Sequence, residues 1–394
     1  MASQANLFES AYQELFSWCA ARDFAGHDPF DALNSRVLRA TPLTKSKNAR
    51  FVWTQLVKRS PLDLRPVTLV PPERNAKGLA LFALGLLANF RRLHNEETAT
   101  QARTILDDLV SSQLPGYSGA AWGYNFDWQS RHFFAPQGSA TIVPTAFAGR
   151  ALLEASQAFG DAKYLDTARS VCNFILQDLP RSAENENEVC FSYAPQSDTR
   201  IFNASLLAAE ILAGVYEATG ESALADWALR ATRYVIKQQN ANGSWVYGTN
   251  PNQAWVDNFH TAFVLFSLYR IVKSLSLGSE FAAALASGYE YWKTNFFLAD
   301  GWPKYYDDDP FPADAHAGAS AIVTFLEMSE LDATATNRAA TIASWTIRNL
   351  RDQQGFFYYQ RRKFYTVRKP YMRWSQAWML YALGKLLEVG AKVE

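Results

Sequence analysis

The sequence predicts an all-α fold, an alpha-alpha toroid in which six helical hairpins close into an (α/α)6 barrel. Three observations predict it: a repeat of about 57 residues, a polar residue that opens a nearly all-apolar helix in each repeat, and an aromatic-rich loop just before that helix. The five openings are Thr145, Asn203, His260, His316 and Ser375. Because a ring collects the starts of its inner helices around one cavity, we expect the chemistry of this protein in that cavity.

The repeat runs from about residue 75 to the end of the 394-residue chain, so we interpret residues 1–394 as one domain. Residues 1–75 are predicted to form a degenerate first hairpin and a loop, with the proline-containing stretch 60–72 lying over the mouth of the ring. The helices that would complete the ring are expected near residues 7–21, 49–58 and 75–94.

The first helix of each later unit is amphipathic. In one of them Trp227, Ala231 and Tyr234 recur at spacings of four and three residues, so one side is buried and the other faces solvent. The second helix of each unit, such as the one that opens at His260, is apolar on nearly every side and therefore belongs inside the ring. The expected outer helices span residues 162–177, 223–239, 281–295 and 333–353.

A pair of aromatic residues lies in the loop before each of these inner helices. The near-alternate spacing of each pair predicts a short extended segment in each mouth loop. Aromatic rings on a cavity wall offer flat apolar platforms, which suit the faces of sugar rings. The pairs are Trp122 and Tyr124, Phe191 and Tyr193, Trp245 and Tyr247, Trp302 and Tyr305, and Phe357 and Tyr359.

Composition and charge exclude several classes of function. Lys plus Arg and Asp plus Glu both number 38, so no global field draws the chain toward nucleic acid or an anionic bilayer, and local charge must carry any recognition. The longest apolar run, residues 78–90, is too short to span a membrane. Three cysteines without a C-x-x-C pair and no visible signal peptide predict reduced thiols in a cytoplasm. The five histidines lack a zinc-like spacing and no glycine-rich phosphate loop occurs, so neither a metal nor a nucleotide cofactor is expected.

Residue types that suit a sugar acid gather in the mouth loops. Tyrosine and histidine can transfer a proton, a nearby aspartate can orient the histidine, and arginine can neutralise a carboxylate. The catalytic candidates are Tyr247, Asp257, His260, Tyr305, Tyr365 and Arg373. The candidates for substrate binding are Trp122, Tyr124, Asp127, Trp128, Trp245, Trp255, Trp302, His316, Arg361, Arg368 and Trp374. Each has a structural alternative, because aromatic pairs can seal hairpins and Asp257 or Asp314 can cap the helix that follows it.

The fifth mouth loop is strongly basic. Residues 361–373 contain six cations, which repel one another unless an anion is near. We therefore expect an anionic oligosaccharide or polysaccharide as the substrate.

One short motif resembles a known toroid family. The segment from Gln239 to Trp245 resembles the Q-x-x-x-G-x-W repeat of terpenoid cyclases and prenyltransferase beta subunits. This resemblance implies the toroid fold. It does not extend to the D-x-D-D motif that protonates a polyene in the cyclases, because residues 307–310 read D-D-D-P.

The last unit resembles two further groups of proteins. Residues 372–378, M-R-W-S-Q-A-W, are similar to a segment of bacterial toroid proteins encoded with exopolysaccharide machinery, and that similarity extends over most of the chain. Arg373 and Trp374, followed by an apolar helix, resemble the C-terminal domain of glucuronyl C5-epimerases over about 35 residues, although Gln376 stands where that family has a tyrosine. These resemblances imply a bacterial polysaccharide or its lipid-linked precursor as substrate, and association with a polysaccharide synthase complex.

We therefore expect a carbohydrate-active enzyme that abstracts the C5 proton of a uronic acid residue, as an epimerase or a lyase. Three alternatives remain open. A glycoside hydrolase would use two carboxyl groups from Asp127, Asp257, Asp308 and Asp314. A terpenoid cyclase-like protein would need an aromatic cavity with one deep acid, and a non-catalytic glycan-binding toroid would lack an acid-base pair.

Overall fold

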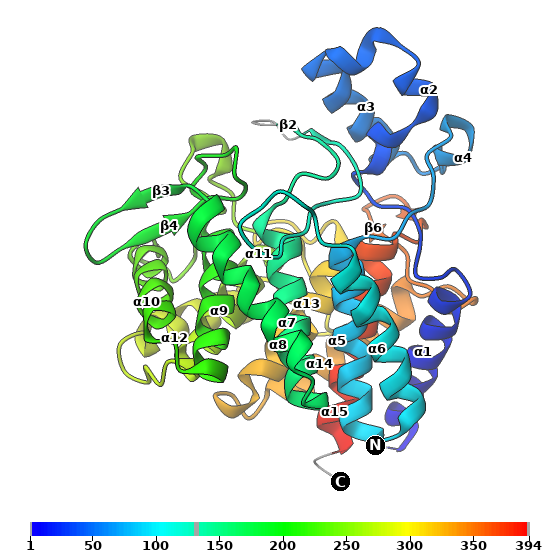
Figure 1. The fold of residues 1–394 in the computed structure, drawn as a ribbon. Helices are drawn as coiled ribbons and strands as arrows, with labels where there is room; N and C mark the ends of the chain where they lie inside the picture. The colour runs from blue at the N-terminus through cyan, green and yellow to red at the C-terminus, as the bar shows by residue number, and fades with distance from the viewer. Residues whose placement is uncertain (1, 130–133, 392–394) are drawn as a thin grey trace.

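The computed structural model, which describes residues 2–129 and 134–391, confirms the toroid (Figure 1). Its long helices form an inner and an outer layer. The inner helices are α5 (Ala76–Leu93), α7 (Ile142–Phe159), α9 (Phe202–Thr219), α11 (Asn258–Ser274), α13 (Ala315–Glu327) and α15 (Trp378–Ala391). The outer helices are α1 (Ala2–Ala20), α6 (Glu96–Ser111), α8 (Ala162–Asn173), α10 (Ser222–Lys237), α12 (Ala282–Asn295) and α14 (Ala335–Leu350).

The inner helices form a closed ring. Each packs against the next one along the chain, and α15 packs against α5, so the last unit meets the first. Gly85 on α5 and Gly384 on α15 permit this close approach, since a Cβ atom at Gly384 would lie 2.7 Å from the backbone oxygen of Gly85. Helix α1 packs against α15 and α14 and completes the outer layer.

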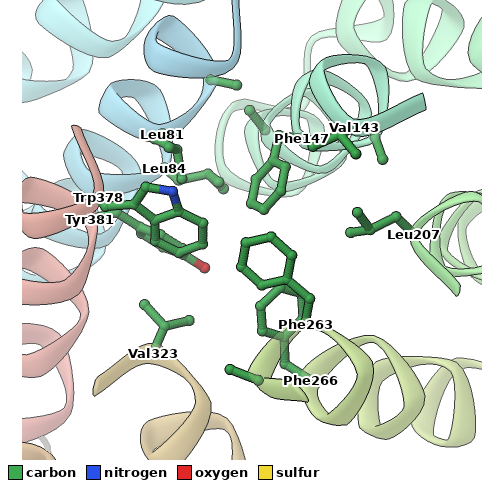
Figure 2. Close-up of a cluster of buried hydrophobic side chains, with 14 of the residues drawn as sticks. Leu81, Leu84, Val143, Phe147, Leu207, Phe263, Phe266, Val323, Trp378 and Tyr381 are labelled. Carbon is green, nitrogen blue, oxygen red and sulfur yellow. The ribbon is translucent and has the colours of Figure 1, made fainter. Parts of the chain in front are cut away.

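The centre of the ring is filled by side chains from the inner helices (Figure 2). The rings of Phe147, Phe263 and Trp378 meet there, with centroids between 5.3 and 5.6 Å apart. Phe266 and Tyr381 continue this packing along the axis (Figure 2). The barrel is therefore a packed core, and open space remains only toward its ends.

Ion-paired residues line a cavity of about 410 Å³ at the end of the ring where the inner helices finish. Arg150 pairs with Glu210, and both side chains are buried. Arg270 pairs with Glu210 and Glu327, and Lys385 also pairs with Glu327. These charges are mutually satisfied, so we interpret this end as structural.

The N-terminal region departs from the expected hairpin. Helices α1 and α5 belong to the ring as predicted, but α3 (Lys47–Arg59) does not fill it. Residues 21–75, which we call the lid, instead place α2 (Arg36–Arg39), α3 and α4 (Arg65–Thr68) above the end at which the inner helices begin (Figure 1). Short 3-10 turns at Asp31–Asn34 and Pro42–Lys45 join them. The reason is that α3 has a buried side and a wide exposed side, as a surface helix requires, whereas the inner positions need helices that are apolar all round.

The mouth loops contain short extended segments, as predicted, but most of these lie beside the aromatic pairs: of the paired residues only Phe191, in β4, belongs to a described strand. All are antiparallel. The pairs are β1 (Trp128–Gln129) with β2 (Phe134–Ala135), β3 (Arg181–Glu184) with β4 (Val189–Phe191), and β6 (Gln360–Arg361) with both β5 (Ala313–Asp314) and β7 (Thr366–Val367). Two segments of wider helical turn, Phe174–Asp178 and Met372–Ala377, follow α8 and precede α15.

Two further findings bear on the setting of the protein. Within the described residues, no helix has both the length and the apolarity to cross a bilayer. Cys19, Cys172 and Cys190 are free thiols and all three are buried.

Candidate active site

A cavity of about 530 Å³ lies at the end of the ring where the inner helices begin. It is closed above by the lid, through Phe51, Gln55 and Lys58 of α3. Every inner helix contributes a residue at or just before its first turns. These residues are Lys77, Val143, Asn203, His260, His316 and Trp374. Three of the five predicted openings are among them, whereas Thr145 and Ser375 lie outside the lining.

Asp257 and His260 form a hydrogen-bonded pair on the wall of this cavity. Asp257 caps α11 through Oδ1, which accepts from the backbone N–H of His260. Its Oδ2 lies 2.7 Å from Nδ1 of His260 and also accepts from the indole N–H of Trp255 at 3.0 Å. Nε2 of His260 has no partner among the described residues, and the side chain is 23% exposed toward the cavity. The pair therefore presents an oriented imidazole nitrogen to a ligand.

Asp314 and His316 stand at the matching position of the next unit but do not form such a pair. Asp314 caps α13 through the backbone N–H groups of His316 and Ala317, and its carboxylate accepts from Gln360 and from the indole of Trp374. Burial raises the pKa of Asp314 to about 6. The ring of His316 is 1% exposed and neither of its nitrogens has a partner among the described residues, so burial lowers its pKa well below the usual value.

Lys77 lies at the floor of the cavity in aromatic surroundings. Its Nζ stands 4.3 Å from the ring centre of Phe147, 5.0 Å from that of Phe263 and 5.4 Å from that of Trp378. It forms no ion pair with a described residue, and burial lowers its pKa well below the usual range for lysine. An anion that entered the cavity would meet this amine without competition from a protein carboxylate.

Two other basic side chains face the cavity from different elements. Arg373 donates through Nε and Nη2 to Asp28 of the lid at 2.7 and 2.9 Å, which leaves Nη1 without a described partner. Burial opposes its charge, but Asp28 outweighs burial and keeps the pKa of Arg373 raised. Lys58 of the lid lies over the ring of Phe30 at 4.1 Å, and burial lowers its pKa to about 8.

The side walls are aromatic. Tyr247 stacks on Trp255 with ring centres 4.7 Å apart and lies 4.4 Å from the ring of His260. Tyr124 and Tyr305 also line the cavity. Burial raises the pKa values of these three tyrosines, so their phenols stay protonated and act as hydrogen-bond donors.

The structure brings many of the predicted residues to this one cavity. Those that line it are Tyr124, Trp128, Tyr247, Trp255, His260, Tyr305, His316, Arg373 and Trp374. Asp257 lies directly behind His260.

Three of the predicted aromatic contacts are placed elsewhere. Trp122 and Trp245 are buried under the hairpins, where their indole N–H groups donate to the backbone oxygens of Leu109 and Val235. Trp302 donates to the backbone oxygen of Pro310 and packs outside the cavity. In these three pairs the first member seals its hairpin, while the second member, Tyr124, Tyr247 or Tyr305, reaches the cavity.

Four polar predicted residues also lie outside the cavity wall. Asp127 pairs with Arg39 of the lid at 3.5 Å. Arg361 and Arg368 are exposed beside β6 and β7, where they stack on Trp302 and Tyr358, and Tyr365 is 40% exposed. Three of the six cations of the basic loop, Arg361, Lys363 and Arg368, thus face solvent, and of its predicted site residues Arg373 lies on the described cavity wall.

Sequence reasoning missed three basic residues of the cavity, Lys58, Arg59 and Lys77. Lys77 follows the capping residue Asn75 and opens the apolar stretch of α5, so the opening pattern of the later units would have identified it. Lys58 and Arg59 belong to an insertion, and no periodic signal places an insertion over the cavity.

No protein-family model matches the chain, and no curated protein matches it in sequence. Solved structures match its fold. Cellobiose 2-epimerase from Bacillus thermoamylovorans superposes with a TM-score of 0.62 and 14% identity over 79% of this chain and 87% of that one. A family 76 alpha-mannanase from Bacteroides thetaiotaomicron superposes with a TM-score of 0.61 and 12% identity over 80% of this chain and 87% of that one. An unsaturated glucuronyl hydrolase specific for heparin superposes with a TM-score of 0.59 and 13% identity over 80% of this chain and 86% of that one. At these identities the similarity establishes the toroid fold.

Proposed function

We propose that this protein is a carbohydrate-active enzyme that moves a proton at C5 of a uronic acid residue, as an epimerase or a lyase. One observation carries the proposal: the Asp257/His260 pair opens onto a cavity whose described lining contains Lys58, Arg59, Lys77 and Arg373 but no Asp or Glu. A base beside cations is what abstraction of a proton next to a carboxylate requires.

The cations would bind the carboxylate of the sugar. Arg373 is held rigid by Asp28 and keeps Nη1 for a ligand, while Lys58 and Lys77 approach from the lid and the floor. Charge-assisted hydrogen bonds of this kind strengthen in a site that excludes water. Aromatic walls at Tyr247 and Trp255 would hold the sugar faces.

The pair supplies the base. Asp257 accepts a hydrogen bond from the Nδ1–H of His260, so Nε2 carries the lone pair that takes the proton from C5. The electrons pass into the carboxylate, and the cations stabilise the resulting enolate. Donation of a proton to the opposite face of C5 by a tyrosine such as Tyr305 gives the epimer. Loss of the oxygen at C4, with a proton from a tyrosine such as Tyr305, gives the unsaturated product of a lyase.

The alternatives are less well supported by the same residues. Hydrolysis needs two carboxyl groups across a glycosidic bond, yet Asp257 and Asp314 are engaged in capping and Asp127 in an ion pair. A polyene cyclase needs a deep acid where Lys77 lies. A purely binding protein has no use for the oriented nitrogen of His260.

The comparisons add support of a general kind. By their titles, the solved proteins reported above are an epimerase, a mannanase and a glucuronyl hydrolase, all of which handle sugars. The resemblance of residues 372–378 to exopolysaccharide-associated toroids makes a cytoplasmic step in polysaccharide synthesis, next to a synthase complex, part of this proposal.

The test is incubation of the protein in deuterated water with a panel of uronic acid oligosaccharides, followed by NMR. The proposal expects deuterium at C5, with inversion for an epimerase or a new ultraviolet absorbance for a lyase. Deuterium at C2 of a reducing sugar would contradict the proposed reaction at C5 and indicate a 2-epimerase. New reducing ends without deuterium would contradict it as well and indicate a hydrolase. The matched control is His94→Asn, at an outer loop remote from the cavity lining.

A further inference from the structure

The lid has a basic and apolar outer surface. Residues 36–62 contain seven Lys or Arg and no Asp or Glu, in a chain whose formal charge is zero. Large apolar side chains are exposed between these cations. They are Val37, Leu43, Val52, Leu56 and Leu62, followed by Val67 and Leu69 in the next stretch of the lid.

Helix α3 shows how this surface is arranged. Phe51, Gln55 and Lys58 face the cavity, at the spacing of one helical turn. Val52 and Leu56 lie one position further along and are 64% and 54% exposed, so they form a separate outward face. Packing within the lid does not explain why apolar side chains stand at these two exposed positions.

The hairpin of β6 and β7 extends the same surface. Its residues 361–369 contain five cations and no acid, of which Arg361, Lys363 and Arg368 are exposed, and Phe364 at its tip is 87% exposed. The hairpin is joined to α3, because Lys369 donates to the backbone oxygen of Val57 at 2.8 Å and Tyr365 to that of Arg59 at 3.5 Å. We call the lid and this hairpin together the docking surface.

Arg39, Arg65 and Arg74 of the docking surface pair with carboxylates, but other cations of this surface do not. Six exposed ones form no ion pair with any residue that the structure describes: Arg36, Lys45, Lys47, Arg59, Lys363 and Arg368. Elsewhere on the molecule exposed cations are commonly paired, as Arg169 is with Glu221 and Arg233 with Glu280. The unpaired cations of the docking surface repel one another, and an anionic partner would relieve this repulsion.

We propose that the docking surface binds the protein to an anionic lipid bilayer. Phosphate head groups would neutralise the cations, and the aliphatic side chains with Phe364 would enter the boundary between head groups and acyl chains. Scattered cations separated by single apolar side chains suit a fluid surface that adapts to each of them. Such binding is peripheral and needs no membrane-spanning helix.

The experiment is co-sedimentation of the full chain with phosphatidylcholine vesicles, with and without phosphatidylglycerol. We expect binding only to the vesicles that contain phosphatidylglycerol, and binding that weakens steeply as salt is added. The double substitution Lys45→Glu/Lys47→Glu should weaken it by roughly tenfold or more. Val52→Ser/Leu56→Ser should weaken it severalfold, because each lost aliphatic side chain removes insertion area.

Matched controls lie on other parts of the ring. Arg338→Glu/Arg348→Glu makes the same charge change on exposed positions of α14, and Leu298→Ser/Leu331→Ser removes exposed leucines outside the docking surface. Both should bind vesicles as the wild type does.

Failure of the wild type to bind phosphatidylglycerol vesicles, or an equal loss of binding in the control variants, would overturn the proposal. Loss of a dimer in sedimentation by Val52→Ser/Leu56→Ser, without vesicle binding, would instead assign the surface to a second copy of the chain. No turnover is involved, so the outcome is independent of the proposed reaction.

Discussion

The starts of helices α11 and α13 have similar sequences and different structures. Each begins with a capping aspartate followed closely by a histidine, Asp257 with His260 and Asp314 with His316. In the first, the two side chains bond at 2.7 Å and face the cavity. In the second, the carboxylate is buried against Trp374 and Gln360, and the histidine ring has no described partner.

The difference is one residue of spacing. His260 is the third residue of its helix, from which a side chain reaches back to the cap, as in a capping box. His316 is the second residue, so its side chain is rotated by about 100° around the helix and points to the axis of the ring. It meets Phe259, which holds the same second position on α11, with ring centres 4.6 Å apart. The spacing therefore makes one pair a candidate base and the other a structural cap.

Replacing each histidine in turn tests most directly whether His260 and His316 have different roles. His260→Gln should lower the rate of deuterium incorporation by about a thousandfold, because it removes the proposed general base. His316→Gln should lower that rate by less than roughly tenfold, since His316 has no carboxylate to orient it. Equal losses in the two variants would contradict the distinction between the two helix starts.

The carboxylates offer a second test. Asp257→Asn should reduce turnover by roughly a hundredfold or more, since the amide no longer holds the tautomer with a free Nε2. Asparagine is a good helix cap, so thermal unfolding should change little. A large fall in the melting temperature at unchanged turnover would show that Asp257 acts only as a cap.

Asp314 should matter for stability instead. Asp314→Ala removes a helix cap and leaves the N–H groups of Trp374 and Gln360 without an acceptor, which should cost about 2 to 4 kcal/mol. Urea denaturation measures this difference in the free energy of unfolding between the variant and the wild type. A variant as stable as the wild type would mean that the buried carboxylate carries no structural role.

The pH dependence of stability gives a second test of the structural role of Asp314. The folded pKa of Asp314 is raised to about 6 from an ordinary value of 3.8, so the folded chain holds this proton more tightly than the unfolded chain. Its contribution is present in full below the ordinary value and is lost as pH rises through about 6. The free energy of unfolding of the wild type, relative to Asp314→Ala, should therefore be greater at about pH 4 than at about pH 7. A pH-independent difference between the two proteins would contradict this linkage.

Lys58, which lies 5.9 Å from the ring of Trp374, gives the smallest expected effect. Its pKa of about 8 means that it is charged below that pH and neutral above it. The KM for a uronate should rise as pH passes 8, and Lys58→Met should raise KM by roughly three- to tenfold at neutral pH and remove this rise. A KM profile that is unchanged by the substitution would place the carboxylate of the substrate elsewhere.

The periodic parts of the fold could be predicted, because a hairpin repeat fixes which helices are inner and where their first residues gather. Tyr247, His260 and His316 were found in this way. The remainder depends on features without a period. The lid is an insertion, and its Lys58 reaches the cavity by tertiary packing. Trp122 could not be distinguished from Tyr124, since burial under a hairpin and exposure in a cavity both favour aromatic residues.

The central claim is that His260 faces the C5 hydrogen of a uronate whose carboxylate is held by cations. A crystal structure of His260→Gln with a bound uronic acid oligosaccharide tests it most directly. The account predicts the carboxylate against Arg373 and Lys58, with C5 about 3 to 3.5 Å from the side chain at position 260. A sugar bound with its anomeric carbon at position 260, or with its carboxylate in solvent, would contradict it.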